Sequence, residues 1–424
     1  MTLYIRLATV SLFCAVACGG GVEPELIPGG GVSDPGIDGD LYVHVIDDDS
    51  DLPLADAEVW IGDELGGQTD SEGLYSAGGL DGPQTITVTA AGYTSATWVG
   101  VNGANVTVPL SARDVDYGQG RVSGSIVGFE DLAVPAGRAN IALVGYTANR
   151  DDDDPNNEID QGDPAPNLCV NAGDGAACEW TLRTRSGQMT VFAFLGTIDA
   201  DENIEITGFA YQQEVVVEDG ATTDGVELAI VDDADLVWPD VSLPSAPDGT
   251  DEVAAAVRLD LGDDGRLMIP VAGALEVPVP DRALLGAASY ELIGFAGTDP
   301  EGAGSIRIDR DLASIEEASV GTFLALPTGV STDGTSFSFE AVGAASVHVA
   351  GVDEGSDESD VWGLAIFDGS TEVTIPAGIT LPEGELRFGV QAIELPEFDP
   401  QDFSLEDLED RVLRVAGDTV TFVN

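Results

Sequence analysis

Two cysteines near the middle of the chain have the spacing for a covalent cross-link. Cys169 and Cys178 lie nine positions apart in a stretch rich in Gly, Asn and Asp. The N-terminus, described below, has the features of an export signal. In an exported protein, two cysteines placed like this are expected to form a disulfide. The alternative is a pair of free thiols, which an oxidising compartment disfavours. We therefore predict a Cys169–Cys178 disulfide.

The acidic stretch before these cysteines has the side chains for binding a hard cation. Residues 149–163 read NRDDDDPNNEIDQGD. Calcium takes about six to eight oxygen ligands, which a folded loop can gather. The spacing differs from an EF-hand loop, which has Gly at its sixth position, and a solvated acidic loop is the alternative. The candidate calcium ligands are Asp151, Asp153, Asn157, Glu158 and Asp160.

Two shorter acidic stretches are weaker candidates for the same chemistry. They are DDDSD, at 47–51, and DLGDDGRL, at 260–267. The second is better explained as a β-hairpin with its turn at Asp264–Gly265, because Asp-Gly is a favoured hairpin turn. We predict no other metal and no organic cofactor.

Residues for catalysis are scarce. The two histidines, His44 and His348, each lie between two valines in a strand-like run. Side chains alternate along a strand, so each histidine is expected in solvent, opposite its valines. The chain has no G-x-S-x-G, H-E-x-x-H or phosphate-binding glycine pattern. With 77 acidic residues, a glycosidase-type carboxylate pair would not stand out in the sequence. An enzyme therefore stays as an alternative function, after a structural or adhesive protein and a binding module.

The tryptophans raise the question of sugar stacking. Four of the five sit among strand residues, where burial in a core is the common outcome. These four are Trp60, Trp98, Trp180 and Trp362. An exposed aromatic strip on one sheet would instead indicate a glycan-binding module.

Charge restricts the partners. The formal net charge is -62, and no lysine occurs in the chain. A surface this acidic repels nucleic acid and bare anionic lipid, so neither is expected as a direct partner. It favours solubility at high ionic strength, although genomic base composition would also deplete lysine codons.

The N-terminus has the features of an export signal. Arg6 supplies a positive charge, and residues 7–17 are apolar but too short to span a bilayer. Ala-Val-Ala at 15–17 is a small-residue cleavage site, and plain secretion is one alternative. Followed by Cys18, it also resembles the bacterial lipobox, with Ala15 in place of the usual leucine. The resemblance implies a signal peptide at 1–17 and acylation of Cys18, which would anchor the protein in the membrane.

The residues after Cys18 are suited to a flexible tether. Residues 18–38 are rich in Gly and Pro and lack apolar periodicity. The residue after the cysteine is Gly19 rather than Asp, which resembles lipoproteins sorted to the outer membrane. The predicted location is therefore the bacterial cell envelope, lipid-anchored at the outer membrane.

Periodicity predicts an all-β fold of tandem β-sandwiches. Short runs of Val, Thr, Ile and aromatic residues alternate with polar residues, and Gly, Asp, Asn and Pro separate them. Residues 404–415, SLEDLEDRVLRV, have helical spacing instead and predict a short helix.

The first folded segment, 39–114, resembles the carboxypeptidase regulatory-like domain, a transthyretin-like sandwich of the immunoglobulin-like kind. The matching residues are Thr69, Asp70, Gly73, Tyr75, Gly82, Gly92 and Tyr93. Independently of the family, Gly73 suits a turn with positive φ, and Asp70 can cap that turn. The family's module carries no catalytic residues.

Three further segments follow. Residues 118–235 loosely repeat the first layout and predict a second, diverged sandwich containing the disulfide loop. Residues 236–320 are β-rich and of unknown type. Residues 321–424 form a last sandwich, where PAGITLPEGELRFGVQAIEL resembles the final strands of a fibronectin type III domain, with Phe388 in place of a tyrosine.

Together these patterns favour a non-catalytic envelope lipoprotein with a structural, adhesive or matrix-contact role. Its partners would be the membrane, through the lipid anchor, and an envelope polymer, glycan or protein. The alternative is a surface receptor module that binds a glycan or peptide.

Overall fold

The structure is a computed structural model that describes most of the chain after residue 36. The described residues are 37–48, 50–113, 118–147, 167–273, 276–298, 303–354, 360–396 and 411–424. Nearly all of their regular structure is β-strand, which confirms the predicted all-β class. No helix among them is long and apolar enough to cross a membrane. The predicted signal peptide and Cys18 lie outside the described residues.

The first segment is a sandwich of two sheets. One sheet has the strand order β4-β1-β7, and the facing strands are β6, β5, β2 and β3. Their bounds are β1 (Asp38–Asp47), β2 (Glu58–Ile61), β3 (Glu64–Gln68), β4 (Leu74–Asp81), β5 (Gln84–Thr89), β6 (Ser95–Val101) and β7 (Asn105–Leu110). Leu41, Val43 and Val45 alternate along β1 and are fully buried between the sheets. The period-two pattern therefore sets which face of β1 enters the core.

The turn before β4 has the geometry predicted from its residues. Gly73 has a φ of 70°, and a Cβ there would lie 2.5 Å from the carbonyl oxygen of Val45. The Asp70 carboxylate accepts hydrogen bonds from the backbone N–H groups of Glu72, at 2.9 Å, and Leu74, at 3.1 Å. Both predictions for this turn, the positive φ and the carboxylate cap, are confirmed.

The second segment is a sandwich made from one folded sheet. The strand order is β10-β9-β12-β13-β14-β8-β11, and only two residue pairs join β13 to β14. The bounds are β8 (Gln119–Ile126), β9 (Arg138–Tyr146), β10 (Leu168–Asn171), β11 (Glu179–Arg185), β12 (Gly187–Asp199), β13 (Ile204–Val217) and β14 (Thr222–Ile230), with 3-10 turns η1 (Phe129–Asp131) and η2 (Asp233–Asp235). Trp180 and Leu182 of β11 share a core with Val191 of β12, so the two parts of the sheet face each other.

The third segment packs on the outside of this sandwich. Its bounds are β15 (Leu236–Val237), β16 (Asp240–Ser242), β17 (Glu252–Asp260), η3 (Gly262–Asp264), β18 (Arg266–Ala272), β19 (Val279–Pro280), α1 (Arg282–Leu285), β20 (Tyr290–Gly297), β21 (Gly304–Leu312) and β22 (Glu317–Ser319). Phe192 and Phe209 of the second segment stack with their ring centroids 5.9 Å apart. Both rings pack in the core of the third segment, which includes Val257. β17 and β18 pair antiparallel, so the predicted hairpin is present. Its turn is η3, closed by a hydrogen bond from the Gly265 N–H to the Gly262 carbonyl oxygen at 2.9 Å, so it lies one residue before the predicted Asp264–Gly265 turn.

The last segment returns to the first. Its bounds are β23 (Thr328–Thr332), β24 (Ser336–Glu340), β25 (Val347–Glu354), β26 (Asp360–Ile366), β27 (Glu372–Thr374), β28 (Glu385–Glu394) and β29 (Arg414–Val423). The sheet β23-β24-β27 covers β25, β26 and β28 across a core that includes Phe337 and Phe388. The helix predicted for 404–415 lies largely outside the described residues; Arg411 is helical, but β29 already begins at Arg414.

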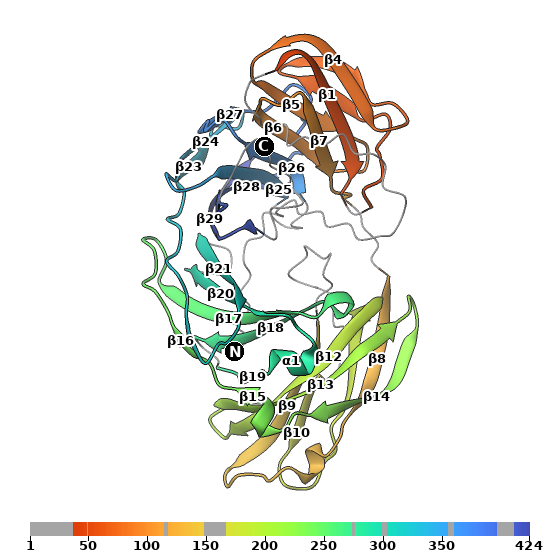
Figure 1. Cartoon of the computed structure of the whole chain (residues 1–424), viewed down its shortest axis with the longest axis vertical. Coiled ribbons are helices and arrows are strands. Elements are labelled where there is room, and N and C mark those ends of the chain that lie inside the picture. The colour runs from red at the N-terminus through yellow and green to blue at the C-terminus, as the bar shows by residue number, and fades with distance from the viewer. Residues whose placement is uncertain are drawn as a thin grey trace.

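One sheet of twelve strands connects three of the four segments. Its order is β18-β17-β20-β21-β29-β28-β25-β26-β6-β5-β2-β3. β26 pairs with β6 in parallel, and β21 pairs with β29 antiparallel. Figure 1 shows the consequence: the first and last segments (red to brown and blue) form the upper half, and the second and third form the lower half. The first described strand, β1, and the last, β29, therefore lie in the same half.

The β6–β26 junction predicts a measurable contribution from one hydroxyl group. The indole Nε1–H of Trp362 donates to Thr97 Oγ1 at 2.9 Å, and Thr97 Oγ1 also bonds Thr87 Oγ1 at 2.9 Å. Thr97→Val would leave the Trp362 and Thr87 groups buried without this partner, at a cost of about 1–3 kcal/mol in the free energy of unfolding. Urea denaturation of the mature chain would measure the loss. Thr97→Ser keeps the hydroxyl and is the control; equal stability of the two variants would contradict the prediction.

Candidate functional site

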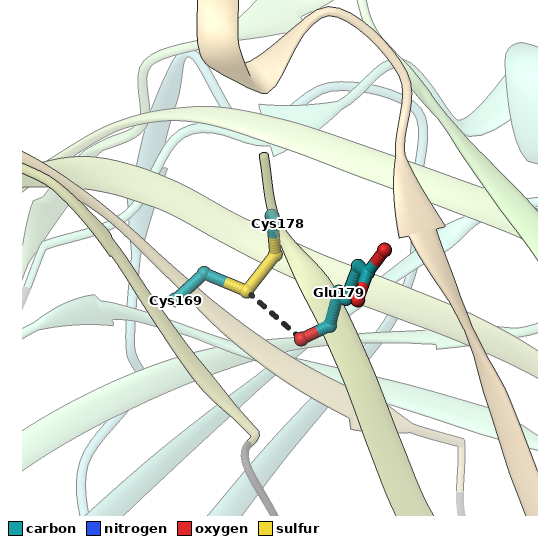
Figure 2. The surroundings of a disulfide bond; sticks show 3 residues. All are labelled: Cys169, Cys178 and Glu179. Carbon is teal, nitrogen blue, oxygen red and sulfur yellow. Dashed lines mark hydrogen bonds between the residues drawn. A yellow bond between two sulfur atoms is a disulfide. The ribbon is translucent and has the colours of Figure 1, made fainter. Parts of the chain in front are cut away.

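The disulfide connects the two edges of the folded sheet in the second segment. Cys169 lies in edge strand β10, and Cys178 directly precedes β11, the strand at the opposite edge. The two residues are bonded, with their Cα atoms 5.3 Å apart. Figure 2 shows the cross-link beside Glu179, whose carbonyl oxygen is 3.8 Å from Cys169 Sγ. The predicted disulfide is present. It joins β10 to the start of β11, the two strands at opposite ends of the hydrogen-bonded strand order.

Burial explains why this cross-link is well placed for stability. Cys178 is fully buried and Cys169 is 7% exposed, and both contact the core around Trp180. An edge strand has partners on one side only, so β10 and β11 are the strands of this sandwich that separate most readily. A covalent bond between them keeps the two parts of the sheet together.

The predicted calcium ligands lie outside the described residues. The structure describes the chain up to Thr147 and again from Asn167, and the candidate residues 151–160 fall between these positions. The strands on either side, β9 and β10, pair antiparallel, so both ends of the predicted loop are at one end of the sandwich. Among the residues that are described, no group of three or more His, Cys, Asp or Glu could hold a metal ion. The calcium site in the loop stays a prediction.

The acidic turn at 47–51 uses its carboxylates to bind neighbouring side chains. Asp47 accepts hydrogen bonds from Tyr93 Oη at 2.7 Å and from the Ser50 backbone N–H at 2.9 Å. Asp48, which is 9% exposed, accepts one from Ser111 Oγ at 2.9 Å. Burial, and secondarily the charge of Asp47, raise the pKa of Asp51. These contacts connect the end of β1 to the β5–β6 loop, through Tyr93, and to the residue after β7, Ser111.

The two histidines have different environments, and one prediction was wrong. His44 is half-buried on β1, with Nε2 at 3.1 Å from the carbonyl oxygen of Glu72. His348 is only 6% exposed, not in solvent as predicted. It shares its face of β25 with Ala350 and Val352, and that face belongs to the core beneath β24. Both faces of β25 are therefore covered. For this reason, the alternation of His348 with valines did not place the histidine in solvent.

The environment of His348 favours its neutral form. Its Nε2 accepts a hydrogen bond from the Val342 backbone N–H at 3.2 Å, and the Phe339 ring lies 5.2 Å away. Burial lowers the pKa of His348. A neutral imidazole with an occupied acceptor nitrogen serves here as a packed side chain with one hydrogen bond.

The tryptophans are mostly core residues, as predicted. Trp98, Trp180 and Trp362 are buried, and Trp60 is half-buried. The sequence reasoning did not single out Trp238, which is 56% exposed after β15. Its neighbours in VWPD, a valine before and a proline after, give no strand-like alternation that would have buried it.

Sequence reasoning also missed the buried polar contacts between strands and segments. Arg387 Nε lies 3.1 Å from the Asp353 carboxylate, and both side chains are largely buried in the twelve-stranded sheet. Asp264 is 3% exposed although its sequence context indicated only a turn. In a chain with so many acidic residues, one that is buried has no distinguishing sequence signal.

A comparison with known protein families and with curated proteins found no match to this chain. The resemblances to the lipobox, the carboxypeptidase regulatory-like domain and the fibronectin type III strands therefore stay predictions.

Removing the disulfide should destabilise the second segment. In the chain-entropy model, closing a loop this short contributes about 2–3 kcal/mol. We expect Cys169→Ser/Cys178→Ser to lower the free energy of unfolding by about that amount, measured by urea denaturation against the oxidised wild type. Peptide mapping of the native protein without reduction should recover one fragment that joins the two cysteines. Full alkylation of both sulfurs without a reductant would contradict the cross-link.

The buried histidine predicts a specific loss of stability on mild acidification. The unfolded chain protonates His348 near its ordinary pKa of 6.5, whereas the folded state, with its lowered pKa, does not. The unfolded state then binds more protons, so the free energy of unfolding decreases as the pH falls through 6.5. Denaturation midpoints measured between pH 7.5 and 6 should show a smaller decrease in His348→Gln. His44→Gln controls for the loss of an imidazole, and an unchanged slope in His348→Gln would contradict the assignment.

Proposed function

We propose that this protein is a non-catalytic lipoprotein of the bacterial cell envelope, in which β-sandwiches held in fixed positions have a structural or adhesive role. The observation that carries the proposal is the continuity of the twelve-stranded sheet through the first, last and third segments. Backbone hydrogen bonds, rather than flexible linkers, connect these segments. An assembly of this kind suits a protein that holds a contact surface at a set position relative to its anchor.

Side chains at the segment boundaries support the same role. Arg113 Nη2 donates to the carbonyl oxygen of Val361 at 3.3 Å, which connects the first segment to the last. Ser305 Oγ donates to the carbonyl oxygen of Val415 at 3.0 Å, which connects the third segment to the last. The exposed Arg113 and the buried Ser305 each bond one segment to another, which restricts relative motion of the segments.

The position of the first strand fits an N-terminal anchor. The last two residues of the predicted tether already belong to the folded part, because Ile37 is only 2% exposed and β1 begins at Asp38. β1 is the central strand of its sheet, between β4 and β7. Tension applied through the tether would act on a strand that is hydrogen-bonded on both sides. The proposed anchor is a diacylglycerol on Cys18, followed by the flexible tether at 18–38, in the outer membrane.

The proposed partners are the membrane, through the lipid on Cys18, and an envelope polymer, glycan or protein at the folded surface. The net charge of -62 disfavours nucleic acid. The partner class can be tested with the chain from Ile37 onward, screened against intact cells, purified envelope polymers and glycan arrays. Parallel screens with calcium and with a chelator would show whether binding depends on the predicted loop.

Acylation of Cys18 is the decisive test of the anchor. We expect the wild-type protein to incorporate labelled palmitate and to fractionate with membranes, because two or more acyl chains give stable anchoring. Cys18→Ser should lose the label and appear in the soluble fraction. Cys14→Ser is the matched control, since Cys14 lies in the segment that cleavage would remove. Wild-type protein that is soluble and unlabelled would refute the lipoprotein proposal.

A further inference from the structure

The hairpin between β17 and β18 places a carboxylate inside the neighbouring sandwich. Asp264, in η3 at the hairpin tip, belongs to the third segment and is 3% exposed. Its Oδ1 accepts a hydrogen bond from Gln188 Nε2 at 2.7 Å. Its Oδ2 accepts two, from Thr190 Oγ1 at 2.8 Å and from the Glu214 backbone N–H at 2.9 Å. All three donors belong to β12 and β13 of the second segment, so the contact crosses from one segment to the other.

A β-bulge in the second segment shapes the receiving side. Pairing between β12 and β13 shifts register between Met189 and Val191, so fully buried Thr190 faces the extra residues of β13. One of these, Glu214, has a φ of 58°. A non-glycine residue in this left-handed conformation is strained, and such residues are often found where a structure binds something. Here the conformation directs the Glu214 N–H group at the Asp264 carboxylate.

Further contacts hold the same hairpin against the sandwich. Thr147, which is 3% exposed, donates its hydroxyl hydrogen to the carbonyl oxygen of Asp264 and accepts a hydrogen bond from the Thr190 N–H at 3.0 Å. Gln213, beside Glu214 in the bulge, donates from Nε2 to the carbonyl oxygen of Leu285 at 2.9 Å. The bulge therefore contacts the third segment at two positions, the hairpin tip and the end of α1.

The donors around Asp264 match the shape of a carboxylate. An amide, a hydroxyl and a backbone N–H supply three hydrogen bonds, and each carboxylate oxygen receives at least one. None of these three groups is charged. Elsewhere in the protein, buried Asp353 is paired with Arg387. Neutral donors fixed by a sheet stabilise a carboxylate through hydrogen bonding and discriminate by geometry against spherical anions.

We infer that the second segment contains a binding pocket for a carboxylate, formed by Gln188, Thr190 and the Glu214 backbone, and that the chain fills this pocket itself with Asp264. We call it the carboxylate pocket. The ligand class is a carboxylate presented at the tip of a hairpin or on a small molecule. Occupation by Asp264 fixes the third segment against the second, in addition to their shared apolar core.

Formate provides a direct test, because Asp264→Ala removes a group of the same size and charge as formate. We expect the thermal midpoint of the full mature chain to fall by about 5–10 °C in Asp264→Ala, since three donors lose their acceptor. Sodium formate should restore at least half of the loss with a saturable dose response. Sodium chloride at the same ionic strength should not, which separates binding from the screening of a highly acidic chain.

Three further variants control the experiment. Asp263→Ala removes the neighbouring carboxylate, which is exposed, and should change the midpoint little. Asp264→Asn fills the pocket, so formate should not restore its stability. Gln188→Ala is milder and is informative even if Asp264→Ala does not fold: it should lower the midpoint by a smaller amount. Where Asp264→Ala folds, adding Gln188→Ala should lower the thermal midpoint less than Gln188→Ala does in the wild type. The reason is that both substitutions remove the same hydrogen bond.

Two outcomes would overturn the inference. One is a midpoint of Asp264→Ala equal to that of Asp263→Ala, which would show that the buried carboxylate contributes nothing specific. The other is equal rescue of Asp264→Ala by formate and chloride, or rescue by neither, which would show that no carboxylate pocket remains. If Asp264→Ala does not fold, a midpoint of Gln188→Ala equal to the wild type would likewise reject it.

Discussion

The architecture depends on sheets that are apolar on both faces, because such a sheet must be covered on both sides. In β12, Val191 and Ala193 enter the core of the second segment, while Phe192 and Phe194 on the opposite face pack against the third. A single sandwich would leave those phenylalanine rings in water, and each ring is a large apolar surface. Burial of the outer face therefore makes the second segment depend on its neighbour. The hydrogen bonds of Asp264 with Gln188 and of Gln213 with Leu285 join the same two segments and supply polar contacts between them.

Charge imposes a second constraint, since the chain has 77 acidic residues and 15 basic ones. Most carboxylates cannot be paired with arginine, and the structure satisfies many of them with N–H and O–H donors instead. Asp333 is the clearest case: hydrogen bonds from Thr335 and Ser336 lower its pKa to about 2, although it is fully exposed. Some arginines do pair with carboxylates in the twelve-stranded sheet, where Arg258 bonds Glu291 and Arg414 bonds Glu394. Hydrogen bonds within turns thus stabilise carboxylates that ion pairs would stabilise in a protein with equal numbers of acidic and basic residues.

The sequence was informative wherever a short stretch determines its own structure. Gly73 and Asp70 specify a turn through local sterics and one carboxylate, and Cys169 and Cys178 are close enough in sequence to bond in any compact loop. It was misleading where a distant segment supplies the environment. Alternation around His348 does not reveal that β24 covers the second face of its strand. The Asp-Gly pair at 264–265 likewise does not reveal the sandwich strands that bind Asp264. One signal was present: runs such as VFAFLG are apolar on both faces, which predicts a partner on each side.

The order of segments along the chain has a consequence for folding. β6 pairs with β26, although more than 250 residues separate Thr97 from Trp362, which are joined by a hydrogen bond. Until the last segment arrives, the first segment exposes the open edge of β6, and Val99 lacks the core that it enters in the complete structure. Pairings so distant in sequence form slowly, and unpaired edges are prone to misassociation. The second and third segments, by contrast, are contiguous and bury their shared aromatic face against each other. We therefore expect the lower half in Figure 1 to fold as a unit before the upper half is completed around it.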